Sequence, residues 1–275
     1  MGRKPDQPSA LFDDFVRPVQ PVAAWVGGKK QLAKPLCRII DAHPHQTYVE
    51  PFVGMGGVFF RRRRAAPVEV INDLSRDVTN LFRILREHFP AFIGTLKYQM
   101  TSRDEFNRLS DMDPDTLTDF QRAARFLYLQ RVAFGGKVTG QSFGVANERP
   151  GRFNLTTLEP MLQDVYERLA GVVIECLPWQ DVLEKYDHAG AMFYLDPPYH
   201  GSEHYYGRGM FAFADYQQMA ERLAELKGRF VLSINDTPEI RDVFEGFRIE
   251  EANVTYTVND GDPTQATELI IQPAP

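Results

Sequence analysis

The residues best suited to chemistry in this 275-residue sequence stand together as Asp196-Pro197-Pro198-Tyr199. They follow residues 191–195, an apolar run whose bulky side chains are typical of a buried central strand. Because prolines cannot donate to a strand ladder and have a preset φ angle, the strand must end here in a stiff loop. We therefore predict a rigid acidic loop at the carboxyl end of a strand, where open α/β sheets place their ligands. The alternative is a loop that only leaves the sheet.

A glycine turn lies near the start of the chain. Trp25 precedes Gly27-Gly28-Lys29, and a helix is expected to follow over residues 31–42. Glycines allow a backbone to approach a ligand closely, and a lysine can meet a carboxylate there. A plain turn with a solvated lysine explains this stretch equally well.

A strand, a second glycine-rich turn and a helix start are expected over residues 47–60. Another strand, residues 68–71, ends at Asn72-Asp73. An acid about 20 residues beyond the glycines can hold a ribose hydroxyl in a Rossmann-type unit. Asp73 could also cap a helix over residues 75–88. The pattern predicts an α/β fold: a Rossmann-like sheet with helices on both faces.

The composition is that of an ordinary soluble globular protein, with 43% hydrophobic and 25% charged residues. A net charge of -6 disfavours general binding to polyanions, so a nucleic-acid role requires a local basic face. Cys37 and Cys176 form neither a metal-ligand spacing nor a disulfide framework, so we expect no metal and a cytoplasmic location. Residues 1–22 are polar and rich in proline, which predicts a flexible tail.

The α/β alternation lapses over residues 92–160, where we expect an inserted, mostly helical and hairpin domain for DNA recognition. Residues 23–91 and 161–275 would then form the catalytic domain. Residues 121–152 contain six cationic residues and one acidic residue, which predicts a basic DNA-contacting surface. Ordinary solvated charges are the alternative, and the run of four arginines at 61–64 is interpreted as a solvated helix end. The predicted DNA contacts are Arg131, Lys137, Arg149 and Arg152.

Four motifs resemble, in order, those of the DNA adenine methylase type of adenine-N6 DNA methyltransferase: residues 25–29, 50–56, 72–73 and 196–199. The resemblance implies S-adenosylmethionine as cofactor, double-stranded DNA as substrate, and a flipped-out adenine held by the Asp196 loop. Many members have Asn-Gly and an arginine where this chain has Gly135-Gly136-Lys137, and Met55 replaces a residue that is often smaller. The implied cofactor contacts are Trp25, Gly28, Lys29, Glu50, Phe52, Gly54, Asp73 and Asp196.

The chemistry of such a site follows from the poor nucleophilicity of the adenine amino group. The Asp196 carboxylate and the Pro197 carbonyl would accept its hydrogens and favour its pyramidal form while the methyl group arrives. Pro198 stiffens the loop, and Tyr199 is the candidate ring to stack on an extruded base.

Three other functions remain open at this stage. The chain could methylate RNA or another amine, such as a protein side-chain amide. Sites that methylate glutamine amides usually resemble Asn-Pro-Pro-Tyr, so an aspartate at position 196 favours adenine. A nicotinamide dehydrogenase would use the glycine turn and Asp73 but leave the Asp196 loop unexplained. A silent DNA-binding relative is disfavoured by the intact loop. We expect a monomer from a bacterium or a phage, and a cognate restriction enzyme is an open alternative.

Overall fold

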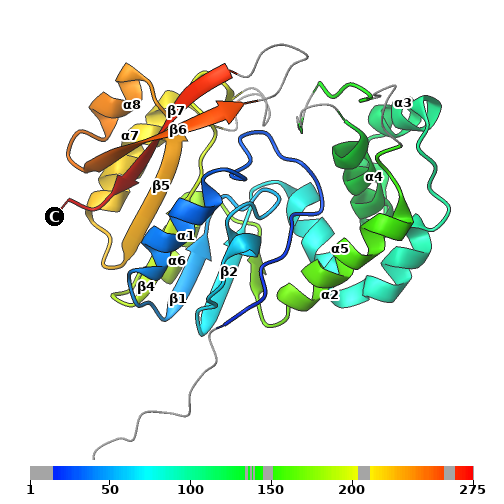
Figure 1. Cartoon of the computed structure of the whole chain (residues 1–275), viewed down its shortest axis with the longest axis horizontal. Coiled ribbons are helices and arrows are strands. Elements are labelled where there is room, and N and C mark those ends of the chain that lie inside the picture. The colour runs from blue at the N-terminus through cyan, green and yellow to red at the C-terminus, as the bar shows by residue number, and fades with distance from the viewer. Residues whose placement is uncertain are drawn as a thin grey trace, which may run out of the picture.

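A seven-stranded sheet forms the centre of the molecule, in the order β3-β2-β1-β4-β5-β7-β6 (Figure 1). The computed structural model describes residues 15–133, 136, 138, 140–144, 151–203, 211–256 and 264–274. Strands β1 to β5 run parallel, and β7 lies antiparallel between β5 and β6. The strands are β1 (Thr47–Glu50), β2 (Val68–Asn72), β3 (Val173–Glu175), β4 (Ala191–Leu195), β5 (Arg229–Asn235), β6 (Arg248–Tyr256) and β7 (Thr264–Gln272).

Helices pack on both faces of the sheet, as predicted. Strand β4 shows why: Met192 and Tyr194 join the buried cluster on one face, while Phe193 and Leu195 join the cluster on the other. None of the described helices has both the length and the apolar character needed to cross a bilayer. One face carries α1 (Ala33–Asp41) and α2 (Arg76–Leu96), and the other carries α6 (Trp179–Tyr186), α7 (Phe213–Ala224) and α8 (Pro238–Val243). The helices α3 (Arg103–Asp111), α4 (Asp119–Val132) and α5 (Leu155–Arg168) extend the first cluster through α2.

The strand order creates a switch point between β1 and β4. All these strands are parallel, but the order in which the chain adds them reverses there. From β1 the chain adds β2 and β3 on one side, and then β4 and β5 on the other side of β1. Crevices at such points, beyond the carboxyl ends of the strands, are where open α/β sheets bind ligands. The residues that follow β1, β2, β4 and β5 therefore meet at one edge, and Asp73 and Asp196 are among them.

Residues 15–22 are packed, in contrast to the flexible tail expected for residues 1–22. The Val16 amide donates to the Arg63 carbonyl (2.9 Å), and the Val19 amide donates to the Phe60 carbonyl (2.7 Å). Val22 is fully buried. Two valines at i and i+3 thus hold this segment against the core, while residues 1–14 lie outside the described part of the chain.

One element differs from the sequence expectation. The helix expected after the second glycine turn is a single 3-10 turn, Phe59–Arg61, because the chain turns inward at Arg62. The chain ends in two long strands, β6 and β7, which pair over nine residues. Helix α6 begins at Trp179, shortly after β3.

Helices α3, α4 and α5 lie beside the sheet as a lobe (right in Figure 1). Helix α2 leads into it through a kink at His88 (φ -137°, ψ 32°), where Pro90 disfavours a regular turn. One buried cluster runs from the sheet through Leu81 to Phe126 of α4, so the lobe shares its core with the sheet. The boundaries expected at 92 and 160 fall inside α2 and α5, and the recognition role of the lobe stays a prediction.

Arg62 corrects the interpretation of the arginine run as a solvated helix end. Its side chain is 0% exposed, its guanidinium lies 3.6 Å above the Tyr48 ring, and its Nη1 donates to Glu69 Oε1 (2.9 Å). Arg168 donates to the other oxygen of the same carboxylate (2.6 Å). Arg168 also donates to Oε1 (2.9 Å), so Glu69 on β2 joins α5 to the turn after β1 through three buried charge-assisted bonds.

Replacing Arg62 by alanine should lower the free energy of unfolding by about 3–5 kcal/mol, because Glu69 would lose one of its two buried cationic partners. Urea unfolding followed by circular dichroism measures this loss. Arg63→Ala is the matched control: its side chain is exposed, and we expect a change within about 0.5 kcal/mol. Equal losses in the two variants would contradict a structural role specific to Arg62.

Candidate active site

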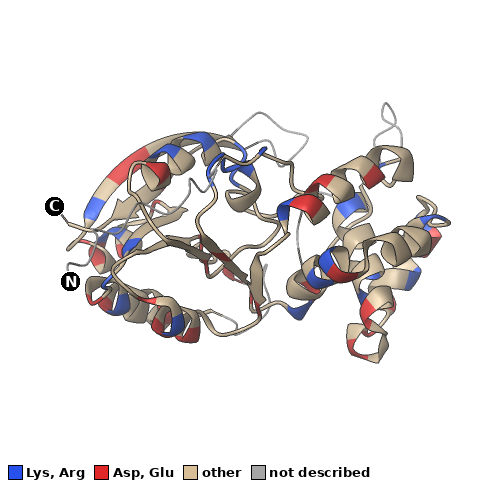
Figure 2. Ribbon diagram, turned by 90° about the horizontal axis from the view of Figure 1, so that it is seen from below, with Lys and Arg blue, Asp and Glu red and all other residues tan. Residues whose placement is uncertain are grey.

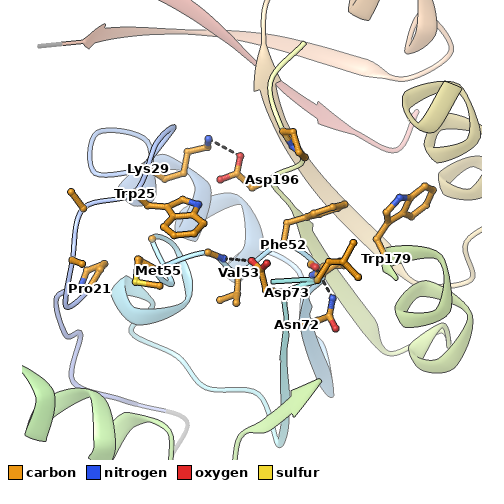
Figure 3. Close-up of a pocket in the computed structure, with 18 of the residues that line it drawn as sticks. Pro21, Trp25, Lys29, Phe52, Val53, Met55, Asn72, Asp73, Trp179 and Asp196 are labelled. Carbon is orange, nitrogen blue, oxygen red and sulfur yellow. Dashed lines mark hydrogen bonds and ion pairs between the residues drawn. The ribbon is translucent and has the colours of Figure 1, made fainter. Parts of the chain in front are cut away.

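A cavity of about 630 Å³ opens at the carboxyl ends of β1, β2 and β4 (Figure 3). Its volume lies within the range of small-molecule sites. Its walls come from the turn before α1, the turn after β1, and the residues that follow β2, β3 and β4. Of the eight predicted cofactor contacts, those that line the cavity are Trp25, Gly28, Lys29, Phe52, Gly54, Asp73 and Asp196.

Asp73 organises the β2 end of the cavity. Its Oδ2 accepts from the Gly54 amide and its Oδ1 accepts from the Ser75 amide, both at 2.9 Å. Burial raises the pKa of Asp73 to about 6, and the two hydrogen bonds oppose this shift. Each carboxylate oxygen keeps a further lone pair with which it can accept from a ligand hydroxyl. Asp73 therefore fixes the turn before α2 and still faces the cavity.

Trp25 lies against the second glycine turn (Figure 3). Gly54 has φ +49°, and a Cβ built there would lie 2.6 Å from Trp25 Nε1. The indole also meets Phe126 of α4 edge-on, with ring centroids 6.3 Å apart. On the other side of the cavity Phe52 packs edge-on against Phe211 (6.1 Å). Aromatic rings thus border a turn that only glycine fits.

Lys29 joins the first glycine turn to the acidic loop. Its ammonium group lies 2.6 Å from Asp196 Oδ1 and donates to the Tyr199 hydroxyl (2.6 Å) and to the Gly27 carbonyl (3.0 Å). Glu268 Oε2 lies 3.5 Å away. The side chain is only 2% exposed. Each of the three ammonium hydrogens therefore has an acceptor within the protein.

Asp196 is partly buried, with its side chain 22% exposed. Burial raises the pKa of Asp196 to about 6, and the Lys29 ammonium opposes that shift. The Ser233 hydroxyl approaches the same oxygen, Oδ1, at 3.5 Å, and the Tyr194 hydroxyl lies 2.7 Å from Ser233 Oγ. Among the described residues these contacts all go to Oδ1, so Oδ2 is the oxygen available to a substrate.

Tyr199 and Pro197 do not line the cavity, whereas Asp196 and Pro198 do. The Tyr199 ring lies 4.6 Å from the Lys29 ammonium, which also holds its hydroxyl. The structure thus brings the loop and the first turn together through Lys29, as two neighbouring walls of one site.

Glu50 is the exception among the predicted cofactor contacts. It is 1% exposed, does not line the cavity, and accepts from the Tyr48 hydroxyl at 2.6 Å. Burial raises the pKa of Glu50 to about 8. As the last residue of β1, it lies on the same face of the strand as Tyr48, because side chains alternate between the two faces. Its side chain therefore points into the core beside the Tyr48 hydroxyl. The structure therefore places Glu50 in the core behind the cavity wall, and its contact with a cofactor stays a prediction.

Two of the predicted DNA-contacting arginines donate hydrogen bonds to backbone carbonyls in this structure. Arg131 donates to the carbonyls of Val22 (2.9 Å) and Arg152 (3.2 Å), and it lines the cavity. Arg152 donates to the Ala133 carbonyl (3.0 Å). These bonds tie the end of α4 to the segment before Trp25. Whether either arginine also meets DNA stays a prediction.

The net positive charge counted over residues 121–152 is partly neutralised in the folded structure. Arg122 pairs with Asp77 (2.5 Å) and Asp115 (2.7 Å), which lie outside the counted stretch. Figure 2 shows acidic and basic residues interspersed along the helices of the lobe. The other two predicted contacts, Lys137 and Arg149, lie outside the described residues.

Asn72 belongs to the motif at residues 72–73, but the sequence assigned it no role of its own. Its amide donates to the carbonyls of Pro51 (2.8 Å) and Leu177 (3.0 Å) and accepts from the Leu177 amide (2.8 Å). It thereby ties together the ends of β1, β2 and β3 and fixes the start of the Asp73 turn. An amide directly after a buried strand was the available signal, since it can satisfy backbone donors and acceptors at once.

The strand order and the cavity at its switch point define a Rossmann-like α/β fold with a ligand site. The chain belongs to the D12 class N6 adenine-specific DNA methyltransferases, whose family model matches residues 25–258. It is an adenine-specific DNA methyltransferase, as its four motifs predicted. It is 24% identical to the type II methyltransferase M.CviBI of Paramecium bursaria Chlorella virus NC1A, over 92% of this chain and 99% of that protein.

Other similarities agree with the family or are distant. The DNA adenine methylase of Serratia marcescens is 27% identical, over 90% of this chain and 95% of its own. Among solved structures, precorrin 8w decarboxylase of Methanobacterium thermoautotrophicum covers 96% of this chain and 98% of its own, with 11% identity and a TM-score of 0.42. That structural likeness is too distant to bear on function.

Methylation should fall on acidification through about pH 6, because protonation of Asp196 removes a carboxylate acceptor and burial has raised its pKa to about 6. The profile of kcat/KM against pH measures this at constant ionic strength. Asp73 titrates in the same range, so Asp73→Asn is the control and should keep the acid limb. A limb below about pH 5, or one lost in Asp73→Asn, would contradict the assignment.

Proposed function

We propose that this protein transfers a methyl group from S-adenosylmethionine to N6 of an adenine flipped out of double-stranded DNA, with Asp196 and Pro197 as the acceptors of the amino group. One observation carries this proposal. Lys29 holds the Asp196 carboxylate by Oδ1 at the rim of a cavity large enough for a nucleoside cofactor. Among the described residues no donor reaches the Pro197 carbonyl, so both acceptors are available to a base.

The residues that line the cavity fit S-adenosylmethionine. Asp73 offers carboxylate oxygens to ribose hydroxyls at one side, and Asp196 places a negative charge where a sulfonium cation is favoured. Phe52 and Trp179 give the apolar wall that an adenine ring requires, and Gly54 keeps the turn clear of side-chain bulk. When bound, this cofactor supplies an electrophilic methyl group.

The chain's own residues would orient the amine and stabilise its changing charge. Asp196 Oδ2 and the Pro197 carbonyl would accept hydrogen bonds from the two amino hydrogens. The amino nitrogen then becomes pyramidal, and its lone pair is less delocalised into the ring. Lys29 favours the ionised carboxylate and holds Tyr199, whose ring stacks on the extruded base. This is electrostatic preorganisation, and it requires no covalent enzyme intermediate.

DNA would bind across the segments around the mouth of the cavity. Arg131 lines the cavity and comes from the end of α4, which supports a DNA path between the lobe and the sheet. We propose Arg131, Lys137, Arg149 and Arg152 as contacts to phosphates or base edges.

The biological setting is also a proposal. Similar proteins carry two kinds of name: the type II methyltransferase M1.LlaDCHI of Lactococcus lactis subsp. cremoris, and the retron Ec67 DNA adenine methylase of Escherichia coli. We propose a cytoplasmic monomer in a bacterium or a phage-infected cell. A cognate restriction enzyme encoded near it would place it in a restriction-modification system.

Asp196→Ala should reduce methylation at least about 100-fold while the fold is retained, since one of two amine acceptors is lost. Wild type and variant are expressed in a host without adenine methylation, and modified bases are located by sequencing that detects N6-methyladenine. Asp181→Ala on α6, an exposed aspartate, is the control and should leave the methylation pattern unchanged. Near-normal methylation by Asp196→Ala would refute the mechanism, and an absence of N6-methyladenine with wild type would refute the substrate.

Lys137→Ala should weaken DNA binding and reduce the slope of log K against log salt by about one ion, because one phosphate contact disappears. Fluorescence anisotropy of a labelled duplex over a series of salt concentrations measures both. Lys227→Ala is the control, since Lys227 precedes β5 at the opposite end of the sheet and should leave the slope unchanged. An unchanged slope in Lys137→Ala would place the DNA surface elsewhere.

A further inference from the structure

The acidic loop is held by a tyrosine from α7. Tyr216 is fully buried, and its hydroxyl donates to the Pro198 carbonyl at 2.8 Å. Glu203 Oε1 is a second acceptor for the same hydroxyl, at the longer distance of 3.1 Å. The hydroxyl of Tyr216 therefore fixes the direction of the second proline's carbonyl.

The end of β5 holds the next part of the loop. Asn235 Oδ1 accepts from the His200 amide (2.9 Å), and Asn235 Nδ2 donates to the His200 carbonyl (3.0 Å). One side-chain amide thus satisfies both backbone groups of a loop residue, as a neighbouring strand would. The His200 ring packs edge-on against Tyr216, with centroids 5.9 Å apart, so the two side chains act on adjacent peptides of the same loop.

The Pro197 carbonyl takes no part in these bonds. The carbonyls of Pro198, Tyr199 and His200 accept hydrogen bonds, whereas no described residue donates to the Pro197 carbonyl. The Pro198 ring fixes the φ angle of that residue, so one torsion, ψ of Pro198, separates the direction of its carbonyl from that of the Pro197 carbonyl. Tying the Pro198 carbonyl to α7 therefore limits how far the Pro197 carbonyl can turn.

We infer that Tyr216 and Asn235 are positioning residues of the methyl-transfer site, which fix the Pro197 carbonyl as the second acceptor of the adenine amine. The inference rests on the proposed function, in which Asp196 and Pro197 share that amine. Neither residue touches substrate: each acts through the backbone of the loop. Their loss should therefore slow the transfer step more than it weakens the binding of cofactor or DNA.

Tyr216→Phe is the direct test, because it keeps the buried ring and removes only the hydroxyl. We expect kcat to fall about tenfold, with the KM values for S-adenosylmethionine and DNA within about twofold of wild type. Tyr186→Phe is the matched control: its hydroxyl donates to Glu175, the last residue of β3, and its kcat should equal that of wild type. Wild-type kcat in Tyr216→Phe would overturn the inference, and so would a loss of kcat accompanied by an equal loss of cofactor affinity.

A second measurement reports how well the target base leaves the stack, separately from the rate of methyl transfer. A duplex with 2-aminopurine at the methylated position becomes more fluorescent when that base leaves the stack. Tyr216→Phe should give the wild-type increase while its single-turnover rate is reduced, and a lost increase would overturn the inference in favour of a role in base entry.

Asn235→Ala provides a variant at the other end of the same loop. Because both side chains hold one segment, the double variant should lose less rate than the product of the two single losses. Losses that simply multiply would show independent effects and overturn the inference. Wild type that does not methylate adenine would refute the proposed function itself, which is a different outcome from any result with an active wild type.

Discussion

The contact between the Lys29 ammonium and Asp196 is the interaction on which the site depends. A buried ammonium ion is costly unless protein acceptors replace its water, and the cost falls only when the partners are well placed. Here the acceptors come from the first glycine turn and from both ends of the acidic loop. Lys29 can be satisfied only if these segments meet. The same bonds that neutralise the lysine therefore set the positions of the Asp196 carboxylate and of the Tyr199 ring.

Much of the sheet could be predicted because parallel strands buried on both faces are continuous apolar runs. Residues 191–195 and the prolines after them gave both the strand and its end. Asp73 and Asp196 could be placed at the cavity because acids directly after such strands must lie at one edge. Glu50 shows the limit of this argument. It follows the same kind of strand, but it is still part of β1 and its side chain turns into the core.

What could not be predicted depends on partners far apart in the chain. Arg62 looks like its arginine neighbours in sequence, and only Glu69 and Arg168, which is 99 residues from Glu69, explain its burial. The side chains that hold the acidic loop lie 18 and 35 residues beyond their partners. Such polar contacts have no periodicity, so hydropathy patterns carry no trace of them. Charge counted along a helix has the same weakness, as the pairing of Arg122 with two distant acids shows.

The fit between Gly54 and Trp25 constrains how this sequence can change. A methyl group at position 54 would overlap the indole at position 25, and the left-handed backbone there disfavours any L side chain. Position 54 can therefore become larger only in a chain that has already exchanged its tryptophan for a smaller residue and has rebuilt the turn. The constraint runs in one direction: a tryptophan at position 25 requires glycine at position 54, whereas glycine at position 54 tolerates a smaller residue at position 25.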